Sequence, residues 1–194
     1  RLLQGFRGEV DDWDWEAALL YSKATSDDIT SNRVSNTLLK EALNDSTPAA
    51  YNPFSAGVNS NVERILVDVY RKGSSSLAMM DFKVSNGDFM DLSAGPMGVM
   101  FGIEVRREQI VDDRDPRLDG TITYTDYEND TYPEIGDVVN SSPTGDVSGE
   151  RNTLSLFTEA QIPLAENVNA QLALRYENMS DVEDSLVSKL AVGW

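Results

Sequence analysis

Carboxylates and arginines are the side chains of this sequence that could do chemistry. The 194 residues include 33 Asp and Glu, 16 Lys and Arg, and neither histidine nor cysteine. A Ser-His-Asp triad, a histidine general base, the usual histidine-rich metal sites, disulfides and zinc–thiolate sites are therefore excluded. A carboxylate pair for glycoside hydrolysis needs a defined separation, which the sequence does not supply. We therefore expect no catalytic residue, no enzyme activity and no cofactor.

Four charged residues occupy segments in which every second residue is apolar. Glu104 and Arg106 lie in "GIEVRRE", Glu159 lies in "LFTEAQIP" and Arg175 lies in "LALRYE". These segments are consecutive predicted strands, so opposite charges can pair across the sheet. A structural role is the favoured interpretation of the four residues, and direct contact with a ligand is the alternative.

An acidic segment lies between two of these strands. Residues 108–150 hold 12 acidic and 2 basic side chains, in a chain whose net charge is −17. Such a surface makes nucleic acid a poor partner. The stretch "DPRLDGTITYTD" partly matches a calcium-binding EF-hand loop, but Arg117 replaces a ligand and Asp126 replaces the closing glutamate. A solvated acidic loop is favoured, with loose calcium binding by Asp115, Asp119 and Asp126 as the alternative.

Strands must position these residues. From Val99 on, residues 95–108 alternate apolar and polar side chains, which predicts a strand with one apolar face. Similar patterns predict about seven strands, the first of them partial, over residues 1–10, 13–23, 76–85, 95–108, 152–163, 169–177 and 185–194. The Asn86-Gly87 pair predicts a turn between the third and fourth strands.

The predicted strands are joined by three shorter links and two long connections. The shorter links are residues 86–97, 163–168 and 178–184, and the long connections are residues 24–75 and 109–150. Long connections that contain no strand usually carry function. In the first long connection, the apolar spacing predicts a short helix at 35–45 and a second at 61–73, closed by Gly73.

The apolar face of these strands could be buried in a soluble β-sandwich or exposed to lipid. Three features favour a membrane barrel. The strand Val99–Glu108 has the length of a tilted membrane-spanning strand. Full charges lie in mid-strand, where a water-filled lumen tolerates them. Aromatic residues lie near strand ends, namely Trp13, Trp15, Tyr21, Tyr176 and Trp194. No apolar run is long enough for a membrane-spanning helix, but barrel strands need none.

Several motifs, taken in order, resemble the β-barrel of TonB-dependent outer-membrane receptors. They are "GFRGEVDDWDWEAALLYSKA", "YNPF", "DLSAGPMGVMFGIEVRRE", "LFTEAQIPL", "LALRYENMSD" and "SKLAVGW". Positions that match the family's strand patterns are Gly95, Gly102, Glu104, Arg106, Glu159, Pro163, Arg175, Tyr176, Ser180 and Asp181. The order and spacing of these pieces extend over essentially the whole chain.

The resemblance implies an all-β fold, an antiparallel transmembrane β-barrel fragment of about seven strands. Residues 1–194 would form part of the barrel domain, with the plug domain and the remaining strands outside this chain. The long connections would be extracellular loops containing short helices, and the links at 86–97 and 163–168 would be periplasmic turns. Glu104, Arg106, Glu159 and Arg175 would face the lumen, where they contact the plug or the ligand.

The resemblance also implies a function and a location. The protein would be an active transport receptor in the outer membrane of a Gram-negative bacterium. Its partners would be outer-membrane lipid, a small-molecule or oligomeric nutrient, and the TonB–ExbB–ExbD energy-coupling complex, reached through the plug. The loop aromatics Tyr51, Phe54, Tyr124 and Tyr127 are candidates for ligand binding. A passive porin-like barrel and a secreted β-sandwich binding module are the alternatives, and iron chelates, cobalamin, peptides and glycans all remain open as ligands.

Overall fold

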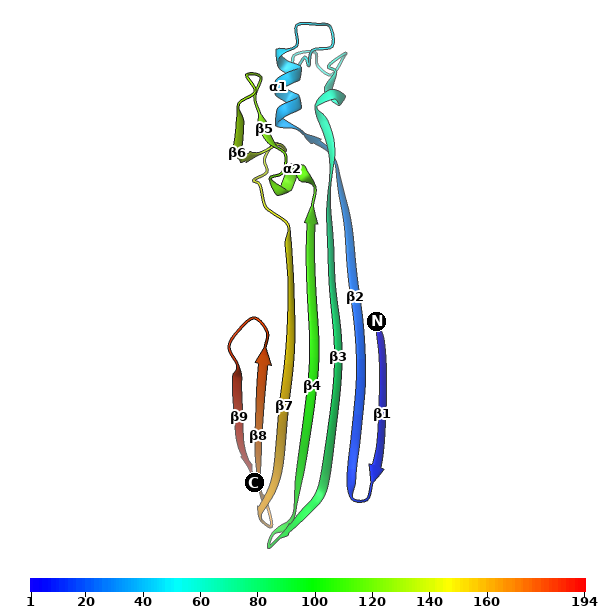
Figure 1. The fold of residues 1–194 in the computed structure, drawn as a ribbon, viewed down its shortest axis with the longest axis vertical. Coiled ribbons are helices and arrows are strands. Elements are labelled where there is room, and N and C mark those ends of the chain that lie inside the picture. The colour runs from blue at the N-terminus through cyan, green and yellow to red at the C-terminus, as the bar shows by residue number, and fades with distance from the viewer. The chain divides into compact units, whose positions relative to one another are not determined.

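Strands make up most of the computed structural model, which describes residues 1–194 (Figure 1). The elements in chain order are β1 (Leu2–Val10), β2 (Trp13–Val34), α1 (Asn36–Asn44), the 3-10 helix η1 (Val62–Ile65), β3 (Leu66–Leu92), β4 (Gly95–Arg114), α2 (Pro116–Asp119), β5 (Thr123–Thr125), β6 (Thr131–Gly136), β7 (Val147–Ala165), β8 (Val168–Met179) and β9 (Ser185–Gly193). Seven strands form one sheet in the order β1-β2-β3-β4-β7-β8-β9. The predicted all-β class and its seven strands are confirmed, and the sheet is open, with β1 and β9 at its edges.

The chain divides into two compact units. Unit 1 consists of residues 1–24, 75–109 and 149–194, and unit 2 consists of residues 25–74 and 110–148. Four strands, β2, β3, β4 and β7, contribute residues to both units, whereas β1, β8 and β9 belong to unit 1 alone. The two helices, η1 and the β5–β6 hairpin all belong to unit 2.

In unit 1 the antiparallel register sorts the side chains by chemistry. Leu156 of β7 pairs with Tyr176 of β8, which pairs in turn with Leu186 of β9. One residue further along β7, Phe157 pairs with Arg175. Because successive side chains of a strand point to opposite faces, the strands share one apolar face and one polar face. The faces predicted from the period-two pattern are therefore confirmed for these strands.

The apolar face of unit 1 is the more exposed of the two faces. On β4, Phe101, Ile103 and Val105 are 47%, 39% and 45% exposed, whereas the side chain of Glu104 between them is only 17% exposed. A soluble protein buries the apolar members of such a pattern and leaves the charged ones in water. The pattern in unit 1 is the reverse, so its apolar face needs an apolar medium.

A glycine on the polar face makes room for a neighbouring aromatic ring. A Cβ atom placed on Gly102 of β4 would lie 2.1 Å from the ring of Phe157 on β7. The ring itself lies beside Arg175, whose guanidinium is 5.5 Å from the ring centroid. Aromatic side chains laid over strand glycines are a known device for holding neighbouring strands in register. Gly102, which the family pattern includes, is therefore a packing position.

Two connections are shorter than predicted because the strands extend further. The predicted helix at 61–73 is wrong, since only Val62–Ile65 is helical and Leu66 begins β3. The segment that follows, "LVDVY", is rich in β-branched residues, and its Val69 is buried. Sheet pairing with β2 and β4 thus overrides a weak helical spacing. The loops reduce to residues 35–65 and 115–146.

The turn predicted at Asn86-Gly87 is also wrong. Both residues lie inside β3, and β3 and β4 are joined at Ser93 and Ala94. The Asn86 side-chain oxygen accepts a hydrogen bond of 2.8 Å from the backbone N–H of Asp88. Asparagine forms this local bond both in turns and within other structure, so the residue pair alone does not fix the position of a hairpin.

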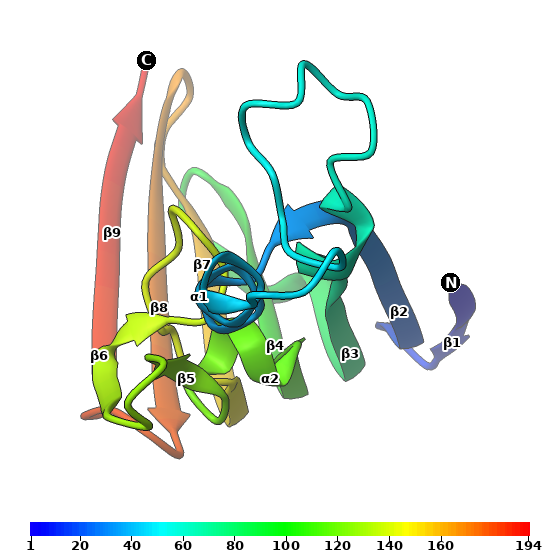
Figure 2. The same ribbon diagram turned by 90° about the horizontal axis from the view of Figure 1, so that it is seen from above.

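Unit 2 has a small core of its own around the start of α1. Ser35 caps the helix, because its hydroxyl oxygen accepts a 3.1 Å hydrogen bond from the backbone N–H of Leu38. Ala42 on the same helix is fully buried, as are Val138 and Asp137 from the other loop. The short helix predicted at 35–45 is confirmed, and α1 lies against the unpredicted β5–β6 hairpin. Figure 2 shows α1 end-on beside the wide loop that leads from it to η1.

Replacing Gly102 by alanine should destabilise the fold. The added methyl group would overlap the Phe157 ring, and overpacking of this kind costs about 1–3 kcal/mol. Urea unfolding of the full-length protein would measure the loss. G5A is the matched control, because a Cβ atom at Gly5 of β1 meets only the Ala17 carbonyl oxygen at 3.8 Å. The double variant G102A/F157A should lose less stability than the two single changes combined, and strict additivity would contradict the packing role.

Candidate functional site

Arg175 is the centre of a polar network on the wall formed by β4, β7 and β8. Its Nη2 atom lies 3.3 Å from Glu104 Oε1 and donates a 3.0 Å hydrogen bond to the Ser155 hydroxyl. Its Nε atom donates to Glu177 Oε1 at 2.9 Å. The structure thus brings together two of the four predicted wall residues, Glu104 and Arg175, with opposite charges paired across β7.

The other two predicted wall residues have separate partners. Arg106 pairs with Glu108 of its own strand at 3.3 Å, although its buried Nε atom has no aligned hydrogen-bond acceptor. Glu159 accepts a hydrogen bond from Gln171, whose side-chain oxygen accepts a 3.0 Å bond from Lys189 Nζ. Since these charges are engaged by their neighbours, the wall geometry supports the structural interpretation.

Several further members of the wall network were not among the four predicted contact residues, although the alternation of their strands places them on the polar face. Ser155, Glu177, Gln171 and Lys189 all lie on the same face as the predicted residues. A further ion pair, Lys83 with Glu16 at 2.8 Å, joins β3 to β2. Strand parity is the signal that identifies most of them, because Ser155, Gln171 and Glu177 each lie an even number of residues from a predicted residue on the same strand.

A buried carboxylate connects the two loops of unit 2. Asp137 Oδ1 accepts a 3.0 Å hydrogen bond from the Ser35 hydroxyl and a 3.1 Å bond from the Thr37 N–H at the start of α1. Its Oδ2 atom pairs with Arg117 Nη1 at 2.9 Å. Acceptors are favoured at a helix N-terminus, where N–H groups lack partners. This carboxylate is fully buried and fully paired, so it fixes the relative position of loops 35–65 and 115–146.

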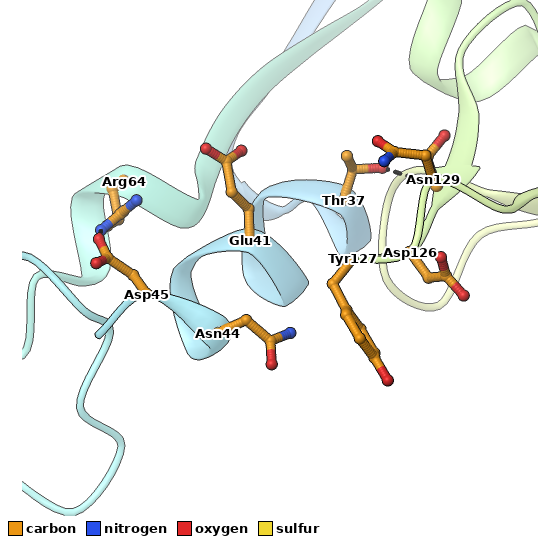
Figure 3. Close-up of a pocket in the computed structure, with 9 residues that line it drawn as sticks. Thr37, Glu41, Asn44, Asp45, Arg64, Asp126, Tyr127 and Asn129 are labelled. Atoms are coloured by element: carbon orange, nitrogen blue, oxygen red, sulfur yellow. Dashed lines mark hydrogen bonds and ion pairs between the residues drawn. The ribbon is translucent and has the colours of Figure 1, made fainter. Parts of the chain in front are cut away.

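A pocket of about 470 Å³ opens on the face of α1 in unit 2. It is lined by Thr37, Glu41, Asn44, Asp45, Arg64, Thr125, Asp126, Tyr127 and Asn129. Figure 3 shows Asp45 and Arg64 on one side of the helix, and Asp126 and Tyr127 from the β5–β6 turn on the other. Both long loops therefore contribute to the lining, and this pocket is the strongest candidate for a recognition site.

An ion pair closes one side of the pocket. Arg64 Nη1 lies 2.7 Å from Asp45 Oδ2 and also donates to the Ala49 carbonyl oxygen. The hydrogen bond from Arg64, together with bonds from Thr47, lowers the pKa of Asp45 to about 2. Asp45 thus stays ionised at any physiological pH. The pair ties the end of α1 to η1, and neither residue was singled out in the sequence.

The four predicted loop aromatics occupy different environments. Tyr127 lines the pocket and is 63% exposed. Tyr124 stacks on Tyr132 of the same hairpin with ring centroids 5.3 Å apart. Tyr51 is half-buried and its N–H donates to the Ala42 carbonyl oxygen, whereas Phe54 is 94% exposed on the wide loop. Of the four, the structure brings only Tyr127 to the pocket.

The predicted calcium ligands are distributed over two elements. Asp115 caps α2 by accepting from the Arg117 N–H, and Asp119 lies at the end of that helix. Asp126 instead lies with Glu128 and Asp130 in a group of carboxylates. Burial opposes ionisation of Asp126, but the Asp130 N–H, the Tyr132 hydroxyl and the Glu128 N–H all donate to it, and the net result is a lowered pKa. The structure does not bring the three predicted ligands together as one group.

The exposed apolar face, the charged inner wall and the long loops define a class of protein. No helix is long and apolar enough to cross a membrane. A one-layer sheet whose apolar side chains face outward while its charges pair on the opposite face is typical of the wall of a transmembrane β-barrel.

Comparison with known proteins gives the family. The family model described as "TonB dependent receptor-like, beta-barrel" matches residues 3–194. The chain therefore belongs to the TonB-dependent receptor β-barrel family, which in general comprises receptors and transporters of the outer membrane. No curated protein matches the chain. Phe101, Ile103 and Val105 lie on the exposed apolar face of this wall, and Glu104 and Arg175 lie on its opposite, polar face.

A lysine on the lipid face should cost more stability than one on the lumen face. Leu190 and Ala191 are neighbours on β9, with Leu190 opposite Leu172 and Ala191 opposite Gln171. L190K should destabilise the receptor by about 2–4 kcal/mol, as charges near the bilayer midplane do, whereas A191K should be nearly neutral. Urea unfolding of the full-length receptor in lipid vesicles measures both. Equal costs would contradict the assigned faces.

The Asp45–Arg64 pair should hold its loop except in strong acid. The pKa of Asp45 is about 2 in the fold and 3.8 without its partners. Its stabilising effect is therefore complete above 3.8 and is lost as pH falls through about 2. At a pH between these two values, pepsin should cut residues 46–60 several-fold faster in D45N than in the wild type, and below pH 2 this ratio should approach one. E41Q, also in the pocket lining, is the control, and a ratio independent of pH would contradict the assignment.

Proposed function

We propose that this chain forms part of the wall and the extracellular loops of an active nutrient receptor. The receptor binds its ligand on the outside of the cell and imports it with energy from the TonB–ExbB–ExbD complex. That energy reaches the barrel through the plug domain characteristic of such receptors. The barrel itself performs no chemical step, so we expect no enzyme activity.

The observation that carries this proposal is the pocket of unit 2. Its lining comes from both long loops, and the buried Asp137 carboxylate holds the two loops together. The volume of this pocket is within the range of small-ligand sites, and its largely polar lining suits a polar ligand.

The wall network also favours a receptor over a passive porin. A selective pore lines its constriction with rings of unpaired charge. Here the Arg175 guanidinium is held by Glu104 and Glu177 at 3.3 and 2.9 Å, so the wall charges largely neutralise one another. The alternative of a secreted β-sandwich lacks support, because the apolar face carries no second sheet and the family is a membrane one.

Uptake by whole cells tests the proposal. The full-length receptor gene would be expressed in Gram-negative cells with and without a functional TonB protein. Each strain would be given a labelled panel of ferric chelates, cobalamin, peptides and oligosaccharides. We expect one compound to accumulate only in cells that contain both the receptor and TonB. Accumulation independent of TonB would favour a passive pore, and no receptor-dependent accumulation of any compound would contradict the proposal.

A further inference from the structure

The pocket of unit 2 holds one carboxylate that has no protein partner. Its other charged groups are already engaged, because Asp45 pairs with Arg64 and Asp126 accepts from two backbone N–H groups and from Tyr132. Glu41, on the exposed face of α1, makes no hydrogen bond or ion pair in the structure. A carboxylate left free within a pocket is available to accept hydrogen bonds from a ligand.

An aromatic ring and two amides accompany this carboxylate. Tyr127 is 63% exposed, and its hydroxyl makes no hydrogen bond within the protein. Asn44 donates to the Lys40 carbonyl at 3.0 Å, which leaves its amide oxygen free, and the Asn129 side chain makes no hydrogen bond. In Figure 3 the Tyr127 ring and the Asn44 amide point in the same direction beside α1. The Tyr127 ring and the Asn44 amide thus lie on one side of α1 in this view and the Glu41 carboxylate lies on the other, so a ligand that contacts both must be extended.

The electrostatics of the pocket disfavour an anionic ligand. Arg64 is the only cation of the lining, and it is bonded to Asp45 and to the Ala49 carbonyl oxygen. Lys40 is close enough to influence Asp126 but does not line the pocket. A phosphate, a catecholate or a polycarboxylate would therefore meet the unpaired Glu41 without a free cation to compensate it, and like charges at short range are repulsive.

We propose that the pocket binds a neutral oligosaccharide. A sugar ring has an apolar face of C–H groups, which can pack on the Tyr127 ring, and hydroxyl donors, which suit the Glu41 carboxylate. The amides of Asn44 and Asn129 can accept from and donate to further hydroxyls. The volume of about 470 Å³ is within the usual range for a small-ligand site. This inference rests on the proposed receptor function and narrows it to one ligand class.

Calorimetry on the full-length receptor in detergent tests the inference. The probes are neutral hexasaccharides of glucose, xylose and mannose in several linkages, with ferric citrate as the anionic counter-probe. We expect one hexasaccharide to bind and ferric citrate not to bind. Y127A should weaken that binding about tenfold, which corresponds to about 1.4 kcal/mol, and E41Q should weaken it by a smaller factor. F54A is the matched control, because Phe54 is an exposed loop aromatic outside the pocket, and it should leave the affinity unchanged.

The outcomes separate this inference from the function on which it rests. Binding of ferric citrate with TonB-dependent uptake, and no binding of any hexasaccharide, would overturn the saccharide inference and leave the receptor proposal intact. Absence of hexasaccharide binding overturns the inference whatever the uptake result. Loss of affinity in F54A equal to that in Y127A would show that the pocket is not the binding site. Hexasaccharide binding without TonB-dependent uptake would support the pocket and contradict active import.

Discussion

The absence of water from a bilayer is the constraint on which this structure depends. In hydrocarbon an unpaired backbone N–H or C=O group is costly, so a membrane-crossing strand must pair with strands on both sides. Once the strands are paired, their side chains can only alternate between the two faces. Apolar residues such as Ile103 then face lipid, and charged residues such as Glu104 are enclosed with their partners on the other face. The inverted exposure of unit 1 follows from these two steps.

The two loops of unit 2 differ from the wall, because their backbone groups are satisfied largely by helices, caps and a short hairpin. The stability of this unit depends on a few buried groups, among which Ser35, Asp137 and Val138 are the most enclosed. The lining of its pocket is mostly polar, and the Asp45–Arg64 ion pair forms one side of it. The wall is built from repeated strand pairing, whereas the loops supply side chains in combinations that strand alternation cannot provide.

Much of the wall could be predicted from the sequence, since a period of two is visible without knowledge of partners. Glu104 and Arg175 were identified in this way, and the structure pairs them. The prediction failed where local pattern and sheet pairing disagree. Leu66 and the residues after it have a helical spacing but extend β3, and Asn86-Gly87 resembles a turn but lies within that strand.

The pocket was harder to predict than the wall. Tyr127 was a candidate because it is an aromatic residue in a long loop, and Asp126 because of a partial match to a calcium-binding loop, whereas Glu41 and Arg64 were not considered. These residues come from segments about sixty to ninety positions apart in the sequence, and only the pairing of the strands brings the segments together. Nothing in the local sequence of α1 indicates that the β5–β6 turn lies beside it. A three-residue strand such as β5 is also too short for its alternation to be recognised.

The buried Asp137 carboxylate has a consequence for how this receptor can diverge. Loop tips usually accumulate substitutions freely, and the wide loop around the exposed Phe54 should do so as well. Ser35, Arg117 and Asp137 are different, because loss of the carboxylate removes a partner from both other side chains, and loss of Ser35 or Arg117 removes one partner from a fully buried carboxylate. Homologues should therefore change these three positions together or not at all. New ligand preferences would then arise by substitution elsewhere in the two loops, while the contact between the loops at Asp137 stays unchanged.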